Sequence, residues 1–584
     1  MKKYGKLIMI LIIFLPILLC ISVGEIKTKM NNLYGENKEI TEEYDKSLSV
    51  EWNNGIFVGK LKENVISFKG IPYAKPPIDE LRWKSPVPAE DSNKVYQAYF
   101  YGKAPIQKEF PFSQGSYYPQ GEDCLYLNIW ANKNDKSENK PIIVFIHGGS
   151  YKGFSTSEPL FEGQNLVEKF PDLIFITIEY RLGILGFIDF ESVEGGDNYK
   201  TSNNLGLLDI ICGLKWIQKN IKKFGGDPGT ITLMGESSGA TLISLLPLID
   251  ESKGLFKRII AESGSLNLSY SKSQSKLLTE KLLEKSGAKN IDELIDLSGE
   301  EIKELQKELN DYCNFATREE NILPLDLYEV YKSGKGKDID MLLGSNENEY
   351  NYWIKSFGSS FASNKILSKL SGELLFRVGI PILFESYYYK NMNDEDKKLV
   401  DKFLNSLNVK NIWKYSEFLT EIIFRLPVTK QAEYHSEAGG KTYVYLWKYA
   451  AEQKKLGAFH TLEMPYTLDN VGKYEFGTLG NPEFEDTVQE MWVNFARTGN
   501  PSISKLNWEP FDTDKRKIMV IDEKFEMIED YKTEQRKLLE PLLKYNFNSN
   551  RNEISYNVPF VYKNAFAAIS ILLILIFTFG KLFK

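Results

Sequence analysis

The chain contains 584 residues, of which 42% are hydrophobic and 26% are charged, and its formal net charge is −7. These proportions are typical of a globular protein and exclude a disordered chain, and the length allows one large α/β unit. The acidic balance gives no electrostatic basis for binding nucleic acid.

The N-terminal segment has the order of an export signal. Three lysines within Met1–Lys6 precede an apolar run from Leu7 to Val23, and this order is typical of a signal peptide. Ser22-x-Gly24 offers a small-x-small cleavage site, whereas the length of the run also suits a retained anchor. Residues 1–24 are therefore predicted to be a signal peptide or an N-terminal membrane anchor, and the polar residues 25–48 a linker.

From about Val50, short β-branched runs alternate with helical stretches. Pro141–Ile146 and Leu173–Ile178 are apolar throughout, as buried strands of a parallel sheet are. Asp209–Phe224 has helical apolar spacing and precedes a β-rich run at Thr230–Met234. This strand–helix–strand succession predicts an α/β fold with a large, mostly parallel central sheet flanked by helices on both faces.

Two helix-rich stretches follow within the same region. Residues 271–310 are rich in lysine and glutamate with amphipathic spacing, and residues 365–438 form a second helical block. We interpret both as helical insertions around the sheet, so that residues 49–545 form one folded domain.

The C-terminal segment is apolar again. Residues 565–579 carry no charge, and adding Gly580–Phe583 gives a length just adequate for a membrane span. A helix docked on the domain is the alternative, which the lack of a polar face disfavours. We predict a linker over residues 546–563 and a transmembrane anchor over 564–584. Lysines at both ends of the chain favour an exported, membrane-anchored protein with its folded domain on the extracytoplasmic side.

The four cysteines and three histidines indicate neither a disulfide framework nor a metal site. Cys20 lies in the apolar leader, which leaves Cys124, Cys212 and Cys313 without a C-x-x-C pair. Buried thiols are therefore expected. The sequence holds no H-E-x-x-H motif and no clustered Cys/His spacing, so we expect no zinc or other metal.

The residues Gly235–Ala240 fit the pattern G-x-S-x-G directly after the Thr230–Met234 run. A strand that enters a tight glycine-flanked turn and then a helix lifts a serine hydroxyl above the end of a sheet. The pattern alone also occurs by chance in chains of this length, so its meaning depends on a base, an acid and oxyanion donors elsewhere.

The base can be found by elimination, because the chain has only three histidines. His147 and His435 have no general-base context, whereas His460 follows Ser237 in the order serine, acid, histidine. Taken alone, His460 would be interpreted as a packing or surface histidine.

Backbone donors for an oxyanion are suggested by Phe145–Ser150, which contains Gly148 and Gly149 after a strand. Glycines there leave N–H groups free to approach a developing negative charge. His147 is expected to brace this loop, and a plain glycine-rich turn remains an equal alternative.

Further motifs follow one another along the chain, namely Phe68–Ala74, Leu81–Trp83, Glu122–Asn128, Glu179–Gly183, Leu205–Asp209 and Asn494–Pro501. Together with Gly235–Ala240, they make the chain from about residue 50 to residue 535 resemble the type-B carboxylesterase and cholinesterase family of the α/β-hydrolase fold. The resemblance implies hydrolysis of carboxylic esters through an acyl-enzyme intermediate without a cofactor.

The resemblance also implies the remaining site residues. The catalytic acid of the family lies five residues after a glycine, which here is Glu349 after Gly344, with Glu347 as the misaligned alternative. The oxyanion donors would be the N–H groups of Gly149, Ser150 and Ser238. The predicted catalytic set is therefore Ser237, Glu349 and His460.

Two buried ion pairs are implied as well, Arg82 with Glu122 and Arg181 with Asp209. Both would be structural, because removing one partner leaves a buried charge without its counterion.

This sequence departs from the family pattern near the site. Ser150 and Ser238 stand where glycine and alanine are usual, Tyr350 and Thr461 replace glycines, and Glu262 replaces a glutamine. Backbone donation survives the first two changes, but Ser150 adds bulk beside the acyl site.

The substrate class is narrowed by a missing tryptophan. Cholinesterases, which the chain resembles, use a tryptophan in this stretch to bind the quaternary ammonium group of their substrate. This sequence has no tryptophan between Phe110 and Glu122, and Tyr117 and Tyr118 would make a weaker cation–π contact with such a group. Choline esters are therefore not expected, and we predict small-molecule carboxylic esters. The alternatives are a lipase acting on lipid esters at the membrane and a catalytically idle adhesion module on the same fold.

Overall fold

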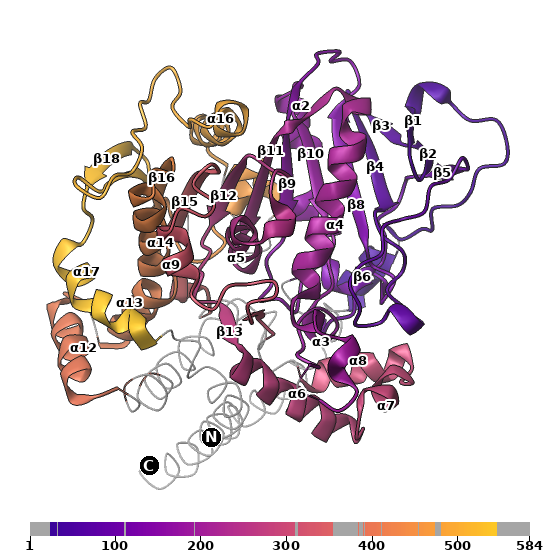
Figure 1. Ribbon diagram of the computed structural model, residues 1–584. Helices are drawn as coiled ribbons and strands as arrows, with labels where there is room; N and C mark the ends of the chain where they lie inside the picture. Colours follow the sequence, from indigo (N-terminus) through magenta and orange to yellow (C-terminus); the bar gives the residue numbers. More distant parts are fainter. Residues whose placement is uncertain are drawn as a thin grey trace, which may run out of the picture.

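The computed structural model describes residues 24–545 except 32, 110–112, 192, 310–313, 354–383, 385–388, 390–391, 410, 452, 454 and 474–479 (Figure 1). The predicted export segment before residue 24, the linker over 546–563 and the anchor over 564–584 lie outside the described residues. Within the described part of the chain, no helix combines the length and the apolar character that crossing a membrane requires.

Eleven strands of the described chain form one sheet in the order β18-β17-β16-β15-β12-β11-β9-β10-β8-β4-β3. Their bounds are β3 Lys60–Lys62, β4 Val65–Pro72, β8 Tyr126–Asn132, β9 Lys140–Ile146, β10 Ile174–Ile178, β11 Gly226–Glu236, β12 Arg258–Glu262, β15 Asp340–Asn346, β16 Thr442–Trp447, β17 Lys517–Ile521 and β18 Phe525–Glu529. Neighbouring strands are parallel throughout the central part of the sheet, from β17 across to β10 in the order given. The outer strands β18 on one side and β8, β4 and β3 on the other pair antiparallel. The predicted α/β fold is confirmed, with a parallel centre and antiparallel edges.

Alternate residues of the central strands enter two different cores. Ile142, Val144 and Ile146 of β9 belong to one core, and Ile143 and Phe145 belong to the other. All seven residues of β9 are buried, because helices cover both faces of the sheet, and this explains the unbroken apolar run in the sequence.

The helices that cover the two faces come from different parts of the chain. One core contains residues of α4 (Leu205–Asn220), α5 (Ser238–Leu245) and α14 (Leu426–Glu437). The other core contains residues of α2 (Gln164–Lys169) and α16 (Pro482–Thr498), and these lie across the sheet from α4 (Figure 1). The remaining helices of the sheet region are α3 Gly183–Gly186, α9 Leu327–Lys332, α15 Met464–Thr467 and α17 Thr533–Leu539.

The predicted helical insertions are present where the structure describes them. The first contains α6 (Lys272–Ser286), α7 (Ile291–Ile295) and α8 (Gly299–Glu308), and it shares a third core with Trp83 and Ile184. Serine capping boxes begin α6 and α8. The second contains α12 (Asp394–Ser406), α13 (Asn411–Thr420) and α14, and most of its earlier part lies outside the described residues.

A small sheet of β1 (Ser49–Trp52), β2 (Gly55–Val58) and β5 (Val95–Gln97) lies beside the β4 edge (Figure 1). The preceding stretch differs from the predicted linker, because residues 37–40 pack on the domain. Glu39 forms a β-bridge with Tyr96, and the Asn37 side chain bonds the backbone at Lys69 and Phe100. Hydrogen bonds to the backbone at this edge therefore hold a polar stretch whose position composition alone does not predict.

Two short strand pairs complete the described strands. They are β6 Ala104–Pro105 with β7 Gln120–Gly121, and β13 Ser269–Ser271 with β14 Ala316–Arg318.

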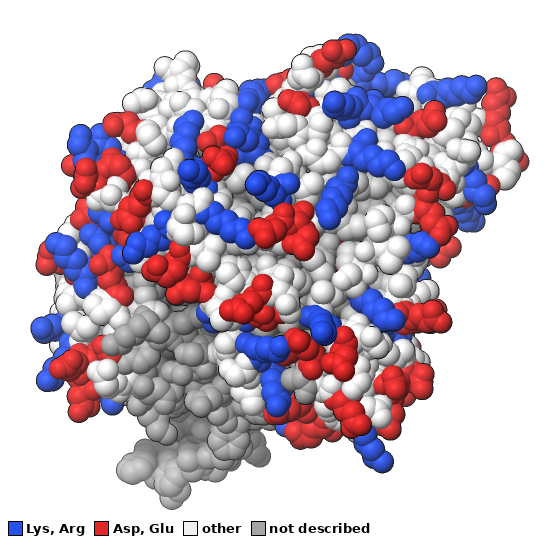
Figure 2. All heavy atoms as spheres, in the orientation of Figure 1, with Lys and Arg blue, Asp and Glu red and all other residues white. Residues whose placement is uncertain are grey.

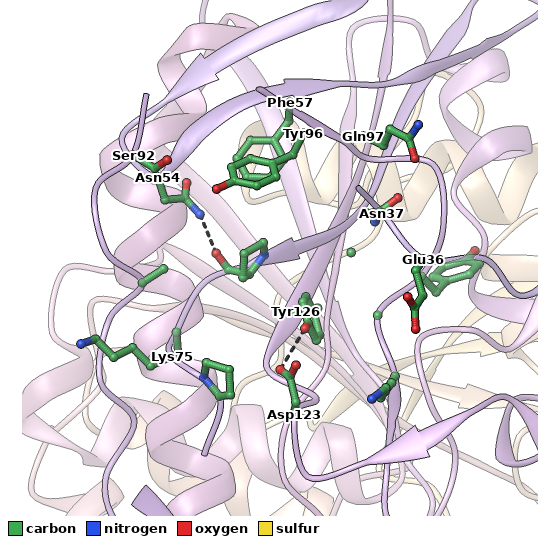
Figure 3. Close-up of a pocket in the computed structure, with 18 of the residues that line it drawn as sticks. Glu36, Asn37, Asn54, Phe57, Lys75, Ser92, Tyr96, Gln97, Asp123 and Tyr126 are labelled. Carbon is green, nitrogen blue, oxygen red and sulfur yellow. Dashed lines mark hydrogen bonds between the residues drawn. The ribbon is translucent and has the colours of Figure 1, made fainter. Parts of the chain in front are cut away.

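A cavity of about 800 Å³ lies between this small sheet, the 34–37 stretch and the start of β8. Figure 3 shows Phe57 stacked on Tyr96 at its wall and the Tyr126 hydroxyl directed at Asp123, to which it donates a 2.9 Å hydrogen bond. Lys75 on the rim pairs with Glu90. None of the site residues predicted above lines this cavity.

Basic and acidic side chains are interspersed over the face shown in Figure 2, which carries no continuous patch of one sign on its described residues. This distribution agrees with the modest net charge of −7. The visible face therefore provides no electrostatic footprint for nucleic acid.

Candidate active site

Ser237 occupies a strained turn between β11 and α5. Its backbone has φ 56° and ψ −122°, a left-handed region that non-glycine residues rarely occupy and that costs of order 1–3 kcal/mol. Gly239 is required beside it, because a Cβ there would lie 2.1 Å from the Ile146 carbonyl oxygen. The chain thus folds as a sharp strand–turn–helix that presents the serine hydroxyl at the carboxyl end of the sheet.

The His460 imidazole connects this serine to a glutamate. Nε2 of His460 lies 2.8 Å from Ser237 Oγ, and Nδ1 lies 2.7 Å from Glu349 Oε2. Glu349 is fully buried and His460 is 4% exposed. Three residues separated by up to 223 positions are therefore joined by two hydrogen bonds, in the geometry that a nucleophile, base and orienting acid require.

Glu349 is held in place from two sides. It lies three residues past the end of β15, and its Oε1 accepts a 2.7 Å bond from the Asn346 N–H and a 2.6 Å bond from the Ser263 hydroxyl. With Oε2 directed at His460, both carboxylate oxygens have partners. The alternative acid, Glu347, lies elsewhere, 3.2 Å from the Lys448 ammonium and 3.1 Å from the Tyr531 hydroxyl.

The other two histidines are engaged away from the serine. His435 is buried against Thr442 Oγ1 at 2.6 Å, and burial lowers its pKa to about 4. His147 lies at the start of the loop that it was expected to brace, and its Nε2 contacts Glu179 Oε1 at 2.9 Å.

Further carboxyl groups are buried around the imidazole. Glu236 Oε1 lies 3.2 Å from His460 Nε2, and burial raises the pKa of Glu236 well above its usual value. Burial also raises the pKa of Glu463 to about 7, with a contribution from Glu349, and it raises the pKa of Glu262. Burial alone would lower the pKa of His460, but the Glu236 and Glu349 carboxylates outweigh it and raise this pKa to about 9. The imidazole and Glu236 therefore titrate as a coupled pair.

Aromatic rings surround the same imidazole. Trp353 stacks on His460 with ring centroids 5.5 Å apart, and Phe424 and Tyr352 approach it at 4.9 and 5.8 Å. Tyr350, which replaces a family glycine, stacks on Trp353 at 4.7 Å. These rings limit the rotation of the histidine and remove it from water.

The glycine-containing loop after β9 lies directly beside the serine turn. The Tyr151 N–H donates to Ser238 Oγ at 3.3 Å, and a Cβ on Gly148 would lie 3.1 Å from Ser237 Cβ. The N–H groups of Gly149 and Ser150 bond no acceptor among the described residues. Ser238 is the first residue of α5, so its N–H has no intrahelical partner.

The two ion pairs implied by the resemblance are present. Arg181 donates to both oxygens of Asp209 at 2.8 and 2.7 Å, and Arg82 donates to both oxygens of Glu122 at 2.6 and 2.7 Å. All four side chains are at least nine-tenths buried.

The remaining sequence predictions concern thiols and tyrosines. Cys124 and Cys212 are buried and unpaired, while Cys20 and Cys313 lie outside the described residues. Tyr117 and Tyr118 are both buried, and Tyr118 packs edge-on against Tyr101 at 6.1 Å.

Several residues of the site carry no signal in the sequence. The Ser263 hydroxyl donates to Glu349 Oε1 at 2.6 Å and lies 3.1 Å from Glu463 Oε1, although Ser263 precedes Glu349 by 86 residues. Trp353 and Phe424 reach the imidazole from separate stretches. The nearest signal was indirect: Glu262, which replaces a family glutamine, directly precedes Ser263 in the sequence.

Comparison with known proteins gives consistent results. A model of the carboxylesterase family matches residues 46–539. The para-nitrobenzyl esterase of Bacillus subtilis is 30% identical over 510 residues, which cover 83% of this chain and 96% of that protein. Liver carboxylesterase 1 of Oryctolagus cuniculus is 29% identical over 77% of this chain and 84% of its own length. A crystal structure of a Geobacillus stearothermophilus carboxylesterase superposes with a TM-score of 0.74 at 26% identity, covering 84% of this chain and 99% of its own.

Proposed function

The chain belongs to the carboxylesterase family and is a serine carboxylic ester hydrolase, and we propose that Ser237, His460 and Glu349 carry out this reaction on small-molecule esters. The observation that supports the assignment is the pair of hydrogen bonds, 2.8 and 2.7 Å long, from Ser237 Oγ through the imidazole to Glu349. The para-nitrobenzyl esterase, whose name denotes a small aromatic ester, supports the substrate class.

In the first half of the reaction, Ser237 Oγ forms a bond to the ester carbonyl carbon while His460 Nε2 takes the hydroxyl proton. The carbonyl oxygen becomes an oxyanion, which the N–H groups of Gly149, Ser150 and Ser238 stabilise. Collapse of this intermediate breaks the carbon–oxygen bond to the alcohol. The imidazolium returns its proton to the departing alcohol, and an acyl-serine remains.

Water completes the reaction by the same route. His460 removes a proton from water as the water oxygen attacks the acyl carbon. The second oxyanion accepts hydrogen bonds from the same three N–H groups. When the intermediate collapses, Ser237 Oγ leaves and regains a proton from His460. Glu349 accepts the Nδ1 hydrogen bond throughout, which keeps Nε2 directed at the serine and stabilises the imidazolium electrostatically.

The assignment of Ser237 is tested by a fluorophosphonate probe, which labels an activated serine covalently. We expect one adduct per chain, located at Ser237 by peptide mass spectrometry, and neither adduct nor hydrolysis of p-nitrophenyl acetate in Ser237→Ala. Undiminished hydrolysis in that variant, with its circular dichroism unchanged, would contradict the proposal.

The substrate class is tested by a series of p-nitrophenyl esters with acyl chains from C2 to C16. We expect kcat/KM to be highest for the short chains, because Ser150 adds bulk beside the acyl site. A maximum at long chains would favour a lipase instead, and an inactive protein that still binds partners would favour an adhesion module.

We further propose that the protein is exported and held at a membrane by its terminal apolar segments. The support is the sequence pattern of Leu7–Val23 after three lysines and of residues 565–579. Truncation after Asn564 should move the protein into the soluble fraction if the C-terminal segment is the main anchor. Continued membrane association would assign the anchor to Leu7–Val23, and a soluble full-length protein would contradict the proposal.

A further inference from the structure

The loop that provides two of the proposed oxyanion donors has a strained backbone at several positions. Between β9 and residue 155, Gly149, Ser150, Tyr151 and Phe154 all have positive φ, at 102°, 57°, 64° and 70°. Three of these residues carry side chains, and each such backbone costs of order 1–3 kcal/mol. A conformation of this kind persists only where surrounding contacts fix it, so the loop requires a clamp.

One buried carboxylate contacts both ends of this loop. Glu179 is 2% exposed, and its Oε1 lies 2.9 Å from His147 Nε2 at the start of the loop. Its Oε2 accepts three bonds of 2.8 Å at the end of the loop, from the Ser155 hydroxyl, the Thr156 N–H and the Thr156 hydroxyl. The carboxylate therefore joins residue 147 to residues 155 and 156.

The position of Glu179 follows from the sheet. Strand β10 is parallel to β9, and Thr177 is aligned with Phe145. Continuing this register by two residues places Glu179 beside His147, one residue past the end of each strand. The backbone of Glu179 is itself anchored, because its carbonyl accepts a 2.7 Å bond from the Tyr73 hydroxyl.

His147 transmits this contact to the donors. Its Nδ1 lies 2.9 Å from the Gly148 carbonyl oxygen, and its own carbonyl accepts a 2.7 Å bond from the Tyr180 hydroxyl. The ring is fully buried and stacks on Tyr180 with centroids 4.7 Å apart. Fixing the Gly148 carbonyl fixes the peptide plane that carries the Gly149 N–H.

We propose that Glu179 is a positioning residue, which acts through His147 to hold the Gly149 and Ser150 N–H groups toward the oxyanion. This inference rests on the proposed function, because it concerns the same oxyanion donors. It assigns Glu179 no contact with the substrate. The clamp works by geometry, so any side chain that reproduces the hydrogen bonds should preserve it.

The variants follow from that geometry. Glu179→Ala removes all four contacts. Glu179→Gln retains an oxygen for Thr156 and an N–H₂ group that can donate to His147 Nε2. The double variant Ser155→Ala/Thr156→Val removes two hydroxyl contacts and leaves the carboxylate in place. Glu122→Ala is the matched control, because the Glu122 side chain is also more than nine-tenths buried and, among the described residues, its carboxylate bonds Arg82 rather than any residue of the loop.

Two readouts separate positioning from plain stability, both normalised to folded protein. We expect Glu179→Ala to lower kcat for p-nitrophenyl acetate by about 10²-fold, since removing one oxyanion donor costs 10²- to 10³-fold, and to change KM less than about threefold. Affinity for an alkyl trifluoromethyl ketone, which becomes a bound oxyanion, should fall by a similar factor. Glu179→Gln should stay within about fivefold of wild type.

The Ser155/Thr156 double variant should lose kcat by about three- to tenfold with KM unchanged, which tests the clamp even if Glu179→Ala does not fold. Glu122→Ala should lower the melting temperature and leave kcat and ketone affinity unchanged. Full kcat and ketone affinity in folded Glu179→Ala, or a Gln variant as impaired as Ala, would overturn the inference. Failure of the proposed function would instead appear as hydrolysis that survives Ser237→Ala, whatever the Glu179 variants do.

Discussion

Two groups of buried ionisable residues in this molecule differ in how their charges are balanced. In the Arg181–Asp209 pair, two hydrogen bonds match one guanidinium to one carboxylate. Around His460, by contrast, several carboxyl groups share a single imidazole, and burial raises the pKa of Glu236 and Glu463. A matched pair keeps both charges balanced, whereas in an unmatched cluster the raised pKa values favour the protonated form of the surplus carboxyl groups.

This difference predicts opposite consequences of mutation. Breaking the matched pair should cost stability and leave the chemistry of the folded protein intact. Changing a member of the unmatched cluster should alter activity and its pH dependence, with a smaller effect on stability. Variants of the ion pair and of the carboxyl cluster are therefore compared both by their activity per folded molecule and by their free energy of unfolding.

The largest effect is expected for Glu349→Gln. The amide has the size of the carboxylate and can keep the Ser263 and Asn346 contacts, but its N–H₂ group facing Nδ1 favours the imidazole tautomer that cannot accept the serine proton. We expect kcat to fall by about 10⁴-fold, as for comparable acid-to-amide changes in serine hydrolases. Steady-state kinetics and thermal unfolding check this expectation, and a loss below tenfold would remove Glu349 from the catalytic set.

Arg181→Ala tests the matched pair. It leaves the fully buried Asp209 without its counterion, which should destabilise the fold by about 3–5 kcal/mol. Activity per folded molecule should remain near that of the wild type. Urea unfolding measures the first quantity and active-site titration the second. The double change Arg181→Met/Asp209→Leu should be less destabilising than Arg181→Ala, because no charge is left behind.

The residues of the proposed catalytic set differ in how readily the sequence predicts them, for physical reasons. Ser237 was found from a local turn motif, and His460 by elimination among three histidines. Elimination fails for acids, since the chain has 79 aspartates and glutamates, and Glu349 came only from the resemblance. The sheet was likewise predicted to be mostly parallel, but its strand order and antiparallel edges depend on pairings between distant segments.

Other residues were not predictable from local pattern at all. Ser263 and Trp353 reach the site because β12 and the stretch after β15 end at the same edge of the sheet. Glu179 was noticed as part of a motif, yet its contact with His147 depends on the register of two parallel strands. Such contacts are tertiary, so they can be predicted only when the whole fold is known and not from a local sequence pattern.

The pH dependence of activity sharpens the comparison further. The proposed mechanism requires neutral His460, and neighbouring carboxylates raise its pKa to about 9, so kcat/KM should rise with pH toward that value. Glu236→Gln removes one carboxylate that favours the imidazolium form of His460, while burial of the ring still disfavours that charged form. The pKa should therefore fall and the midpoint of the rise should move to lower pH. Glu158 is also buried, and its carboxyl group accepts a hydrogen bond from Ser113 instead of contacting the imidazole. Glu158→Gln should therefore leave the midpoint in place, and an unmoved midpoint in Glu236→Gln would contradict this account.

The smallest effect is expected for Ser263→Ala. Its hydroxyl bonds Glu349 at 2.6 Å and Glu463 at 3.1 Å, so the variant removes one of three hydrogen bonds that orient the catalytic acid and leaves the His460 contact intact. We expect kcat to fall by about tenfold, which corresponds to about 1.4 kcal/mol, a size typical of one hydrogen bond to a charged group. The decrease should be smaller in a Glu349→Gln background, because the acid that Ser263 orients is already disabled. Equal decreases in both backgrounds would show that Ser263 acts independently of Glu349, and the carboxyl cluster would then not work as one unit.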